Sequence, residues 1–338
     1  MPPKLHNLVA AMTSSTHMRL VGDSILDQPM AGDSATAARF SPAGRVASGN
    51  AALQTINELQ AELRQLHAEV ALLRRRDDTV NHAIQQIDEE QRLAARLQRD
   101  FLPHHLPSIP GYNFSTLFRP ASYVSGDLFD VARLDEHHFY FYLVDAVGHG
   151  MPAALLTMFL KQALRTKEIT GHSYRIIPPG EALGKLNSLL VEQELSQATF
   201  ATALYGVVDT RTNTVTFSSA GHPSPLRIKG DGSQDLIVAD GGLLGIFPDE
   251  AFPETTFTLD PGDRLLLYTD GVEVCFSDDG GESFDTERWR QVLRQYHQLP
   301  PDDLLITFAR EIDGQIGSLS SKDDLTMLLI NVAKTQQA

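Results

Sequence analysis

The sequence predicts an α/β fold in which an antiparallel β-sandwich flanked by α-helices follows a long coiled-coil helix. Three observations support it: a sustained heptad pattern, short apolar runs bounded by tight turns, and helical patterns between these runs. A chain of 338 residues with 42% hydrophobic content can bury a substantial core. We expect a flexible low-complexity tail over 1–50, a coiled-coil dimerisation helix over 51–103 and a globular domain over 104–335.

The first hundred residues contain two contrasting patterns. Residues 1–50 are rich in Ala, Ser, Gly, Thr and Pro without a sustained period, as is typical of a flexible tail. Apolar residues then recur at alternating spacings of four and three, which indicates a coiled-coil seam and hence a homodimer. The apolar seam positions are Ala52, Ile56, Leu59, Leu63, Leu66, Val70, Leu73, Val80, Ile84, Ile87, Ala94 and Phe101.

Three polar residues, Asp77, Gln91 and Gln98, fall on the same register. Polar side chains at core positions of a coiled coil lower its stability but can fix its register and number of strands. The alternative interpretation is a single amphipathic helix that lies on the globular domain.

The globular domain begins at FLPHHLPSIPG, where three prolines within eight residues end the helix. Short turns such as DTRTN indicate antiparallel pairing of consecutive strands, with helices on the outer faces of the sheets. Strands are expected at PGYNFSTLFRP, HFYFYLVDA, TFATALYGVVD, NTVTFSSAG, ETTFTLD, RLLLYTD and DDLTMLLINV, and helices near 151–168, 180–196, 285–297 and 301–315.

Charge and composition exclude several classes of function. A net charge of −15 and a pI near 5.2 argue against nucleic acid as a partner, because phosphate binding needs a basic surface. No stretch approaches about 18 uninterrupted apolar residues, and NLVAAM is too short for a signal peptide, so we expect no membrane span and a cytoplasmic location. The single cysteine, Cys275, excludes an intrachain disulfide and is expected to be a packed thiol.

Acidic residues stand at the ends of several predicted strands. RLLLYTDG, residues 264–271, ends a buried run on an aspartate, and a lone Asp-Gly would simply open a turn. Aspartates also stand at an end of the predicted strands in HFYFYLVDA, SYVSGDLFD and DDLTMLLINV. The strand ends thus carry Asp127, Asp130, Asp145, Asp270, Asp323 and Asp324. If these ends meet, the carboxylates repel one another unless cations lie between them.

Aspartate oxygens are hard donors, and the sequence lacks His-rich or Cys-rich ligand spacings, which favours Mn²⁺ or Mg²⁺ over zinc. Two such ions about 3.5–4 Å apart can lower the pKa of a bridging water and bind phosphoryl oxygens, so no protein nucleophile is required. Directly after DAVGHG, Met151-Pro152 begins an apolar helix whose N-terminus would present partial positive charge to an anion.

The motifs LQRDFLPHHLPSIPG, SGDLFD, DAVGHGMPAALL, FATALYGVVD, SAGHPSPL, LLLYTDGVE and DDLTMLLI follow one another in this order. Over residues 88–332 the chain thereby resembles the SpoIIE-like, RsbU-like bacterial serine/threonine phosphatases, a branch of the metal-dependent protein phosphatase (PPM) clan. The resemblance implies a helix-flanked β-sandwich, a binuclear manganese or magnesium site, and removal of phosphate from Ser or Thr of a partner protein. It further implies a phosphorylated anti-sigma-factor antagonist as substrate, in partner-switching signalling.

The resemblance also assigns metal ligands. Asp145 of DAVGHG is similar to the bridging carboxylate, with the carbonyl of Ala146 as an additional ligand. Asp270 of TDG and Asp323 of DDLT are similar to the other direct ligands. In SGDLFD, Asp127 and Asp130 both match the family motif, and Asp127 ranks first for a contact to metal or metal-bound water.

Asp324 is expected to shape a turn, and two histidines leave alternatives open. His149, between two glycines, either donates a proton to the leaving oxygen or only bonds to the turn. His222 in SAGHPSPL follows a strand into a proline-rich turn, which favours a structural role.

The chain departs from the family pattern in two places. The branch commonly carries a glutamate four residues after the aspartate of TDG, whereas here Val274 holds that place and Glu273 has no assigned role. Arg119 lies eight residues before Asp127 and is not assigned as a phosphate ligand. Two other hypotheses remain: a phosphatase-like binding module without catalysis, and a dimeric scaffold whose coiled coil carries the function. The complete set of acidic motifs favours the enzyme.

Overall fold

The structure, a computed structural model, describes residues 42–194, 199–276, 286–315 and 323–334. The chain divides into two compact units, Met1–Arg76 and Asp77–Ala338. Helix α1, Pro42–Phe101, belongs to both units, and it begins inside the range 1–50 that the sequence analysis assigns to a tail. A proline is favoured in the first turn of a helix because its missing N–H needs no partner there. Most of the predicted tail lies outside the described residues.

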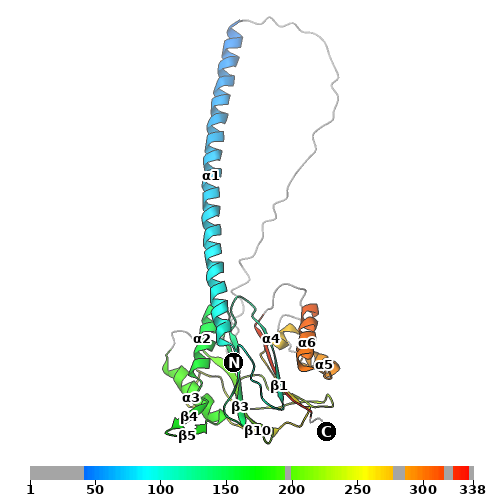
Figure 1. Cartoon of the computed structure of the whole chain (residues 1–338). Helices are drawn as coiled ribbons and strands as arrows, with labels where there is room; N and C mark the ends of the chain where they lie inside the picture. Colours follow the sequence, from blue (N-terminus) through cyan, green and yellow to red (C-terminus); the bar gives the residue numbers. More distant parts are fainter. Residues whose placement is uncertain (1–41, 195–198, 277–285, 316–322, 335–338) are drawn as a thin grey trace, which may run out of the picture. The chain divides into compact units, whose positions relative to one another are not determined.

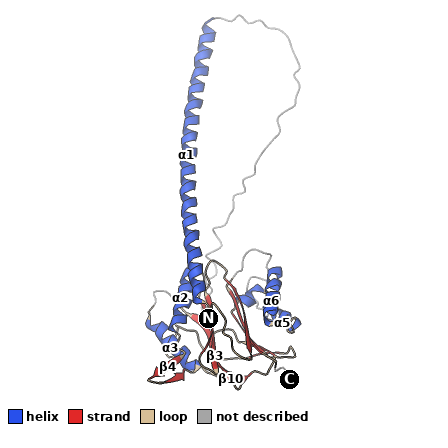
Figure 2. Cartoon of the chain, in the orientation of Figure 1, coloured by secondary structure: helices blue, strands red, loops and turns tan. Residues whose placement is uncertain are grey.

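Two five-stranded antiparallel sheets form the centre of the second unit, which confirms the predicted sandwich (Figures 1 and 2). The strands of the first sheet, in spatial order, are β1 (Tyr112–Arg119), β12 (Leu325–Val332), β11 (Arg264–Tyr268), β8 (Leu226–Ile228) and β9 (Gln234–Leu236). Those of the second are β10 (Thr255–Thr258), β7 (Thr214–Ala220), β6 (Ala201–Asp209), β3 (His138–Ala146) and β2 (Asp127–Arg133).

Helices cover the outer face of each sheet. On the second sheet lie α2 (Met151–Ala163) and α3 (Pro179–Glu192), and against the first lie α4 (Gly271–Cys275), α5 (Thr286–Gln295) and α6 (Pro301–Gln315). The four longer helices of these five confirm the predicted ones. A small hairpin, β4 (Lys167–Thr170) and β5 (Ser173–Ile176), separates α2 from α3 and was not predicted from the sequence.

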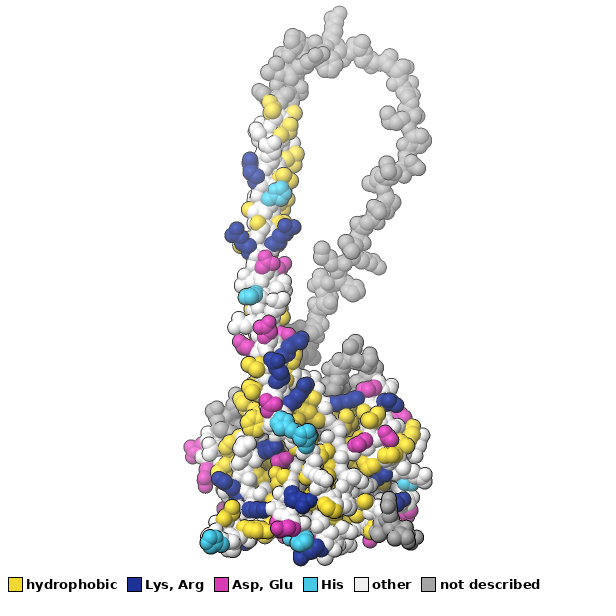
Figure 3. Space-filling model, viewed as in Figure 1, with side chains coloured by type: hydrophobic (Ala, Val, Ile, Leu, Met, Phe, Trp, Pro, Cys, Tyr) yellow, Lys and Arg dark blue, Asp and Glu magenta, His cyan; other side chains and the backbone are white. Residues whose placement is uncertain are grey.

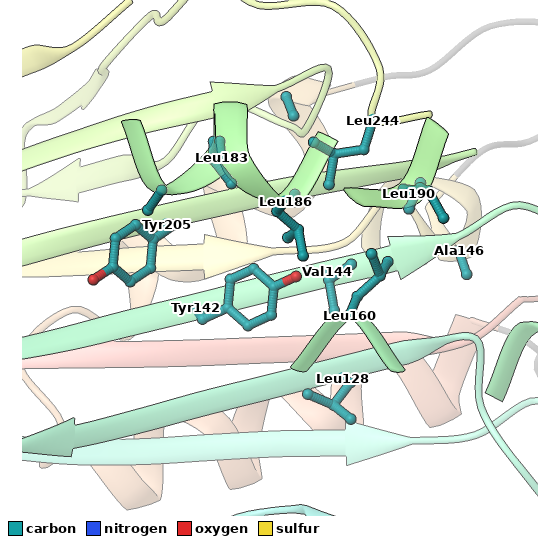
Figure 4. Packing of buried hydrophobic residues seen from close by; sticks show 14 of the residues in the cluster. Leu128, Tyr142, Val144, Ala146, Leu160, Leu183, Leu186, Leu190, Tyr205 and Leu244 are labelled. Atoms are coloured by element: carbon teal, nitrogen blue, oxygen red, sulfur yellow. The ribbon is translucent and has the colours of Figure 1, made fainter. Parts of the chain in front are cut away.

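The two-residue period of each strand divides its side chains between separate hydrophobic clusters. In β3, Phe141 and Leu143 point into the space between the sheets, whereas Tyr142 and Val144 point toward the helices. Figure 4 shows this second group, in which Leu160 of α2 and three leucines of α3 pack against β3 and β6. The strands that carry the acidic residues are therefore buried on both faces.

Helix α1 carries the predicted seam, and most of the seam is uncovered in a single chain. The apolar seam side chains between Ile56 and Ile87 are between 44% and 59% exposed, and Figure 3 shows hydrophobic side chains along the helix. The end of the seam differs: Gln98 is only 2% exposed, and Phe101 packs on the cluster beneath α2 and α3. The expectation that the seam continues to Phe101 is therefore wrong for its last turn, which the chain's own second unit covers.

In the described part of the chain, no helix combines the length and the apolar character needed to cross a membrane.

Gly206 allows the closest packing in the space between the sheets. It pairs with Phe141 across β3 and β6, and a Cβ atom at position 206 would lie 2.2 Å from Cζ of that ring. We predict that Gly206→Ala lowers the free energy of unfolding by about 1–3 kcal/mol through overpacking. Gly184→Ala in α3, where an added Cβ meets no atom within 4 Å, should instead be neutral or stabilising by up to about 1 kcal/mol.

Urea unfolding of both variants beside the wild type measures this difference. Equal stability of the Gly206→Ala protein and the wild type would contradict the packing described here.

Candidate metal centre

The first two aspartates of the centre face each other across β2 and β3. Asp127 begins β2, and its direct partner in the antiparallel ladder is Asp145, near the end of β3. Directly opposed residues of an antiparallel pair lie on the same face of the sheet. Both side chains therefore point toward the space between the two sheets, on the face that carries Phe129 and Leu143 deeper in the sandwich.

Two threonines of the opposite sheet hold the carboxylate of Asp127. Its Oδ2 accepts hydrogen bonds from Oγ1 of Thr269 (2.8 Å) and from Oγ1 of Thr326 (2.7 Å). Thr269 follows β11 directly and Thr326 lies in β12, so this one carboxylate connects the two sheets. The backbone N–H of Thr326 also donates to Oγ1 of Thr269 (3.0 Å). This bond holds the two threonines together beside the carboxylate of Asp127.

The first sheet contributes the next two aspartates at the adjoining ends of β11 and β12. Asp270 follows Thr269, and Asp323 lies two residues before β12. The chain approaches itself closely here, because a Cβ on Gly271 would lie only 1.9 Å from the carbonyl oxygen of Asp324. Glycine is therefore required after Asp270, and the close approach brings Asp270 and Asp323 within electrostatic range of each other.

Burial and mutual repulsion raise the pKa of all four carboxyl groups. Burial is the main cause of the raised pKa of Asp127. The pKa of Asp145 is raised by burial and then by the negative charges of Asp127, Asp270 and Asp323. The pKa values of Asp270 and Asp323 are also above the ordinary carboxyl range, first because of burial and then because of neighbouring carboxylates. Nearby cations would relieve this repulsion.

The donor set fits a hard divalent cation in charge and in chemistry, since it consists of carboxylate oxygens. In the described residues, no three Asp, Glu, His or Cys side chains converge closely enough to enclose an ion as they stand. Ion binding would therefore draw in the exposed Asp270 and the half-buried Asp323 toward Asp127 and Asp145. Ala146 follows Asp145 at the end of β3, is buried, and donates its N–H to the carbonyl of Gly126 (3.1 Å).

Asp130 does not join this cluster, and the expectation that it is a metal ligand does not fit the structure. It lies three residues after Asp127 in β2, so its side chain points to the opposite face of the sheet. There it forms an ion pair with Lys161 of α2 (3.2 Å) and accepts a hydrogen bond from the Tyr140 hydroxyl (2.7 Å). Its role in the structure is to anchor α2 on β2.

Asp324 shapes the chain before β2, as the sequence analysis expects. Its Oδ1 accepts the backbone N–H of Ala121 and its Oδ2 that of Gly126, both at 2.6 Å, and it is 4% exposed. A carboxylate of the first sheet thus holds the segment that leads into Asp127. Arg119 forms an ion pair with Asp313 of α6 (2.7 Å).

The two histidines differ in exposure. His149 is exposed in the loop between β3 and α2. His222 is buried, its Nδ1 lies 2.8 Å from Oγ1 of Thr202, and burial lowers its pKa to about 3. His222 is therefore neutral near pH 7, as a structural histidine would be.

A pocket of about 420 Å³ opens beside the aspartates. Asp145 and Asp270 line it, together with Glu273, whose pKa burial and the Asp270 charge raise. Cys275, in the same short helix α4, is partly buried, and burial raises the pKa of its thiol to about 11. A thiol with such a pKa is a poor nucleophile, in agreement with the predicted packed thiol.

Sequence reasoning did not identify Thr269 and Thr326 as the residues that hold Asp127, nor the contact of Gln98 with Ser125. The two threonines stand inside the motifs TDG and DDLT, directly before Asp270 and two residues after Asp324. The motifs that predicted the aspartates therefore also contain the two threonines. No local pattern links Gln98 to its partner Ser125, which lies 27 residues away along the chain.

The sequence profile of the family described as Stage II sporulation protein E (SpoIIE) matches residues 135–333, more than half of the chain. The chain belongs to the SpoIIE family. This confirms the resemblance on which the ligand assignments rest. The individual ligands stay predictions.

Two curated relatives come from Bacillus subtilis (strain 168). Phosphoserine phosphatase RsbP is 28% identical over 247 residues, 72% of this chain and 58% of RsbP. Phosphoserine phosphatase RsbU is 29% identical over 197 residues, 58% of this chain and 57% of RsbU. The chain thus spans little more than half the length of either relative.

Solved structures show the same fold. The SiaA-PP2C domain of Pseudomonas aeruginosa superposes with a TM-score of 0.64 at 24% identity, covering 74% of this chain and 98% of that domain. The PP2C phosphatase domain of SpoIIE from Bacillus subtilis superposes with a TM-score of 0.54 at 17% identity, covering 67% of this chain and 64% of that one. The sandwich of the SpoIIE-family chain is therefore of the PP2C type.

The raised pKa values predict how the metal-free protein responds to pH. A carboxyl group with a raised pKa keeps a proton in the folded state that the unfolded chain releases near its ordinary pKa of about 4. Above that pH the folded protein binds more protons than the unfolded chain, so the free energy of unfolding falls as pH rises. In EDTA we predict that the free energy of unfolding falls between about pH 5 and pH 8. It should fall less steeply with pH for Asp145→Asn, because the asparagine cannot titrate.

Denaturant unfolding at a series of pH values measures both slopes. A slope for Asp145→Asn equal to that of the wild type would contradict the electrostatic coupling of the four aspartates.

Proposed function

We propose that the chain is a metal-dependent phosphoprotein phosphatase that removes phosphate from Ser or Thr of a regulatory partner. The observation that carries the proposal is that Asp127, Asp145, Asp270 and Asp323 lie at adjoining ends of β2, β3, β11 and β12, near enough for the other three to raise the pKa of Asp145. Four mutually repelling carboxylates beside a pocket are suited to bind two divalent cations, Mn²⁺ or Mg²⁺. Membership of the SpoIIE family supports the same reaction.

Each aspartate has a proposed part in this site. Asp145, the carbonyl of Ala146, Asp270 and Asp323 would hold the ions directly, with Asp145 shared between them. Asp127, fixed by its two threonines, binds a metal or a metal-bound water. When bound, the ions would supply an activated water and neutralise charge on the phosphoryl group.

His149 is proposed to donate the proton that the leaving Ser or Thr oxygen needs. It is exposed, lies in the loop that follows Asp145 and Ala146, and acts electrostatically on Asp323. Histidine is suited to proton transfer near neutral pH. His222 does not suit this part, because burial keeps it neutral.

The proposed substrate is a phosphorylated anti-sigma-factor antagonist, and the proposed location is the cytoplasm. The names of RsbP and RsbU as phosphoserine phosphatases support a phosphoprotein rather than a small metabolite. The open pocket beside Asp145 and Asp270 is bordered by exposed chain, which a protein surface could approach.

The chain is further proposed to act as a homodimer through α1. The apolar seam between Ile56 and Ile87 is about half exposed in one chain. Exposed apolar residues at alternating spacings of four and three are typical of a helix that pairs with a second helix. A second copy of the chain would bury this stripe.

We predict Mn²⁺-dependent turnover of the phosphoprotein that depends on the aspartates of the cluster. Asp145→Asn and Asp270→Asn should each lower kcat/KM by about 100-fold or more, because removal of a ligand charge should exceed the 10–100-fold effect of outer-shell changes. Asp130→Asn is the matched control, and it should stay within about tenfold of the wild type because Asp130 faces α2.

Steady-state kinetics with the phosphorylated antagonist and with small phosphometabolites measures these effects. Full turnover by Asp270→Asn, or much faster hydrolysis of a metabolite than of any phosphoprotein, would contradict the proposal. No turnover of any substrate would favour the binding module or the scaffold.

We predict that the double variant Leu63→Asp, Leu66→Asp is monomeric, because it places charges in the seam. Leu72→Asp is the matched control: Leu72 is 68% exposed but lies off the seam, so this variant should remain dimeric. Sedimentation velocity of the full chain distinguishes these states. A dimer that survives the double change, or a monomeric wild type, would contradict pairing through the seam.

A further inference from the structure

We infer that Gln98 of α1 is a positioning residue for the metal centre, acting through Ser125 on Asp127. The inference rests on the proposed function for the identity of the centre, but it concerns contacts of the chain itself. It differs from the seam role that the heptad pattern predicts for Gln98.

The carboxamide of Gln98 forms two hydrogen bonds with the backbone of one residue. Its Nε2 donates to the carbonyl of Ser125 (2.6 Å), and its Oε1 accepts the N–H of Ser125 (2.9 Å). Gln98 is 2% exposed and Ser125 is fully buried, so water does not compete for either bond. The side chain thereby pairs with Ser125 as a neighbouring strand would.

Ser125 connects Gln98 to the start of β2. Its Oγ accepts the backbone N–H of Asp127 (3.0 Å), while its neighbour Gly126 donates its N–H to Oδ2 of Asp324 (2.6 Å). The carbonyl of Gly126 in turn accepts the N–H of Ala146 (3.1 Å). The segment before Asp127 is thus held from three sides: by α1, by the start of β12 and by the end of β3.

Glutamine is chemically suited to this position, because one planar amide both donates and accepts. A methionine of similar length would leave the buried N–H and C=O of Ser125 without partners. A glutamate would keep the acceptor but lose the donor, and it would add a negative charge near the aspartates. Either change would release the segment that fixes Asp127.

Gln91 provides a matched control on the same helix. It lies one heptad before Gln98, occupies the same seam register, and is half-buried. If both glutamines served only the seam, equivalent changes would have equivalent effects. A positioning role predicts that only changes at Gln98 affect the metal centre.

The test uses the full chain and the variants Gln98→Met, Gln98→Glu and Gln91→Met. Isothermal titration with Mn²⁺ in the absence of substrate measures metal affinity, and turnover at increasing Mn²⁺ gives the concentration for half-maximal activity. Because supporting residues around a metal site contribute 10–100-fold in affinity, we expect Gln98→Met to weaken Mn²⁺ binding by about tenfold or more. Gln98→Glu should also bind more weakly, and Gln91→Met should match the wild type.

Hydrogen exchange at the amides of Ser125 and Asp127 reports on the same contacts without metal. Both amides should exchange faster in Gln98→Met and in Gln98→Glu than in Gln91→Met. If Gln98→Met does not fold, the Gln98→Glu protein provides both measurements.

Unchanged Mn²⁺ affinity in the folded Gln98 variants, or an equal loss in Gln91→Met, would overturn the inference even if the phosphatase activity is present. If the wild type binds Mn²⁺ but hydrolyses no phosphoprotein, the proposed function fails. Weaker binding by the Gln98 variants would still support the positioning role in that case.

Discussion

The architecture of this end of the molecule depends on the carboxylate of Asp127, which connects the two sheets. Its Oδ2 accepts hydroxyl hydrogen bonds from Thr269 and Thr326 of the first sheet, while its backbone is paired with Asp145 within the second sheet. At 1% exposure this carboxyl group has lost its water, which raises its pKa, and the two threonine hydrogen bonds compensate in part. Asp324 adds a second polar link between the same strand ends, since its Oδ2 accepts the N–H of Gly126 directly before Asp127.

The four aspartates of the centre differ in burial. Asp127 is buried, Asp145 and Asp323 are half-buried, and Asp270 is exposed. The backbone before Asp127 is fixed from α1 by Gln98 and from β12 by Asp324.

The sequence predicted the sandwich and the acid-tipped strands because both depend on local patterns, namely the two-residue period and turn residues at strand ends. It went wrong on Asp130, although the same period places residues 127 and 130 on opposite faces. The heptad pattern identified the helix face on which Gln98 lies. It could not show that this face packs on the chain's own Ser125 rather than on a second helix, because that contact joins residues distant in the sequence. The hairpin β4–β5 was missed because its short polar strands depend on ion pairs such as Arg175 with Glu168.

The central claim is that the four strand-end aspartates, and not Asp130, form one cation site. A crystal structure of the full chain soaked in Mn²⁺, with anomalous difference maps collected at the manganese edge, tests it most directly. The account predicts two manganese peaks enclosed by Asp127, Asp145, Asp270 and Asp323, with Asp130 still paired with Lys161. Peaks located elsewhere, or a peak coordinated by Asp130, would contradict it.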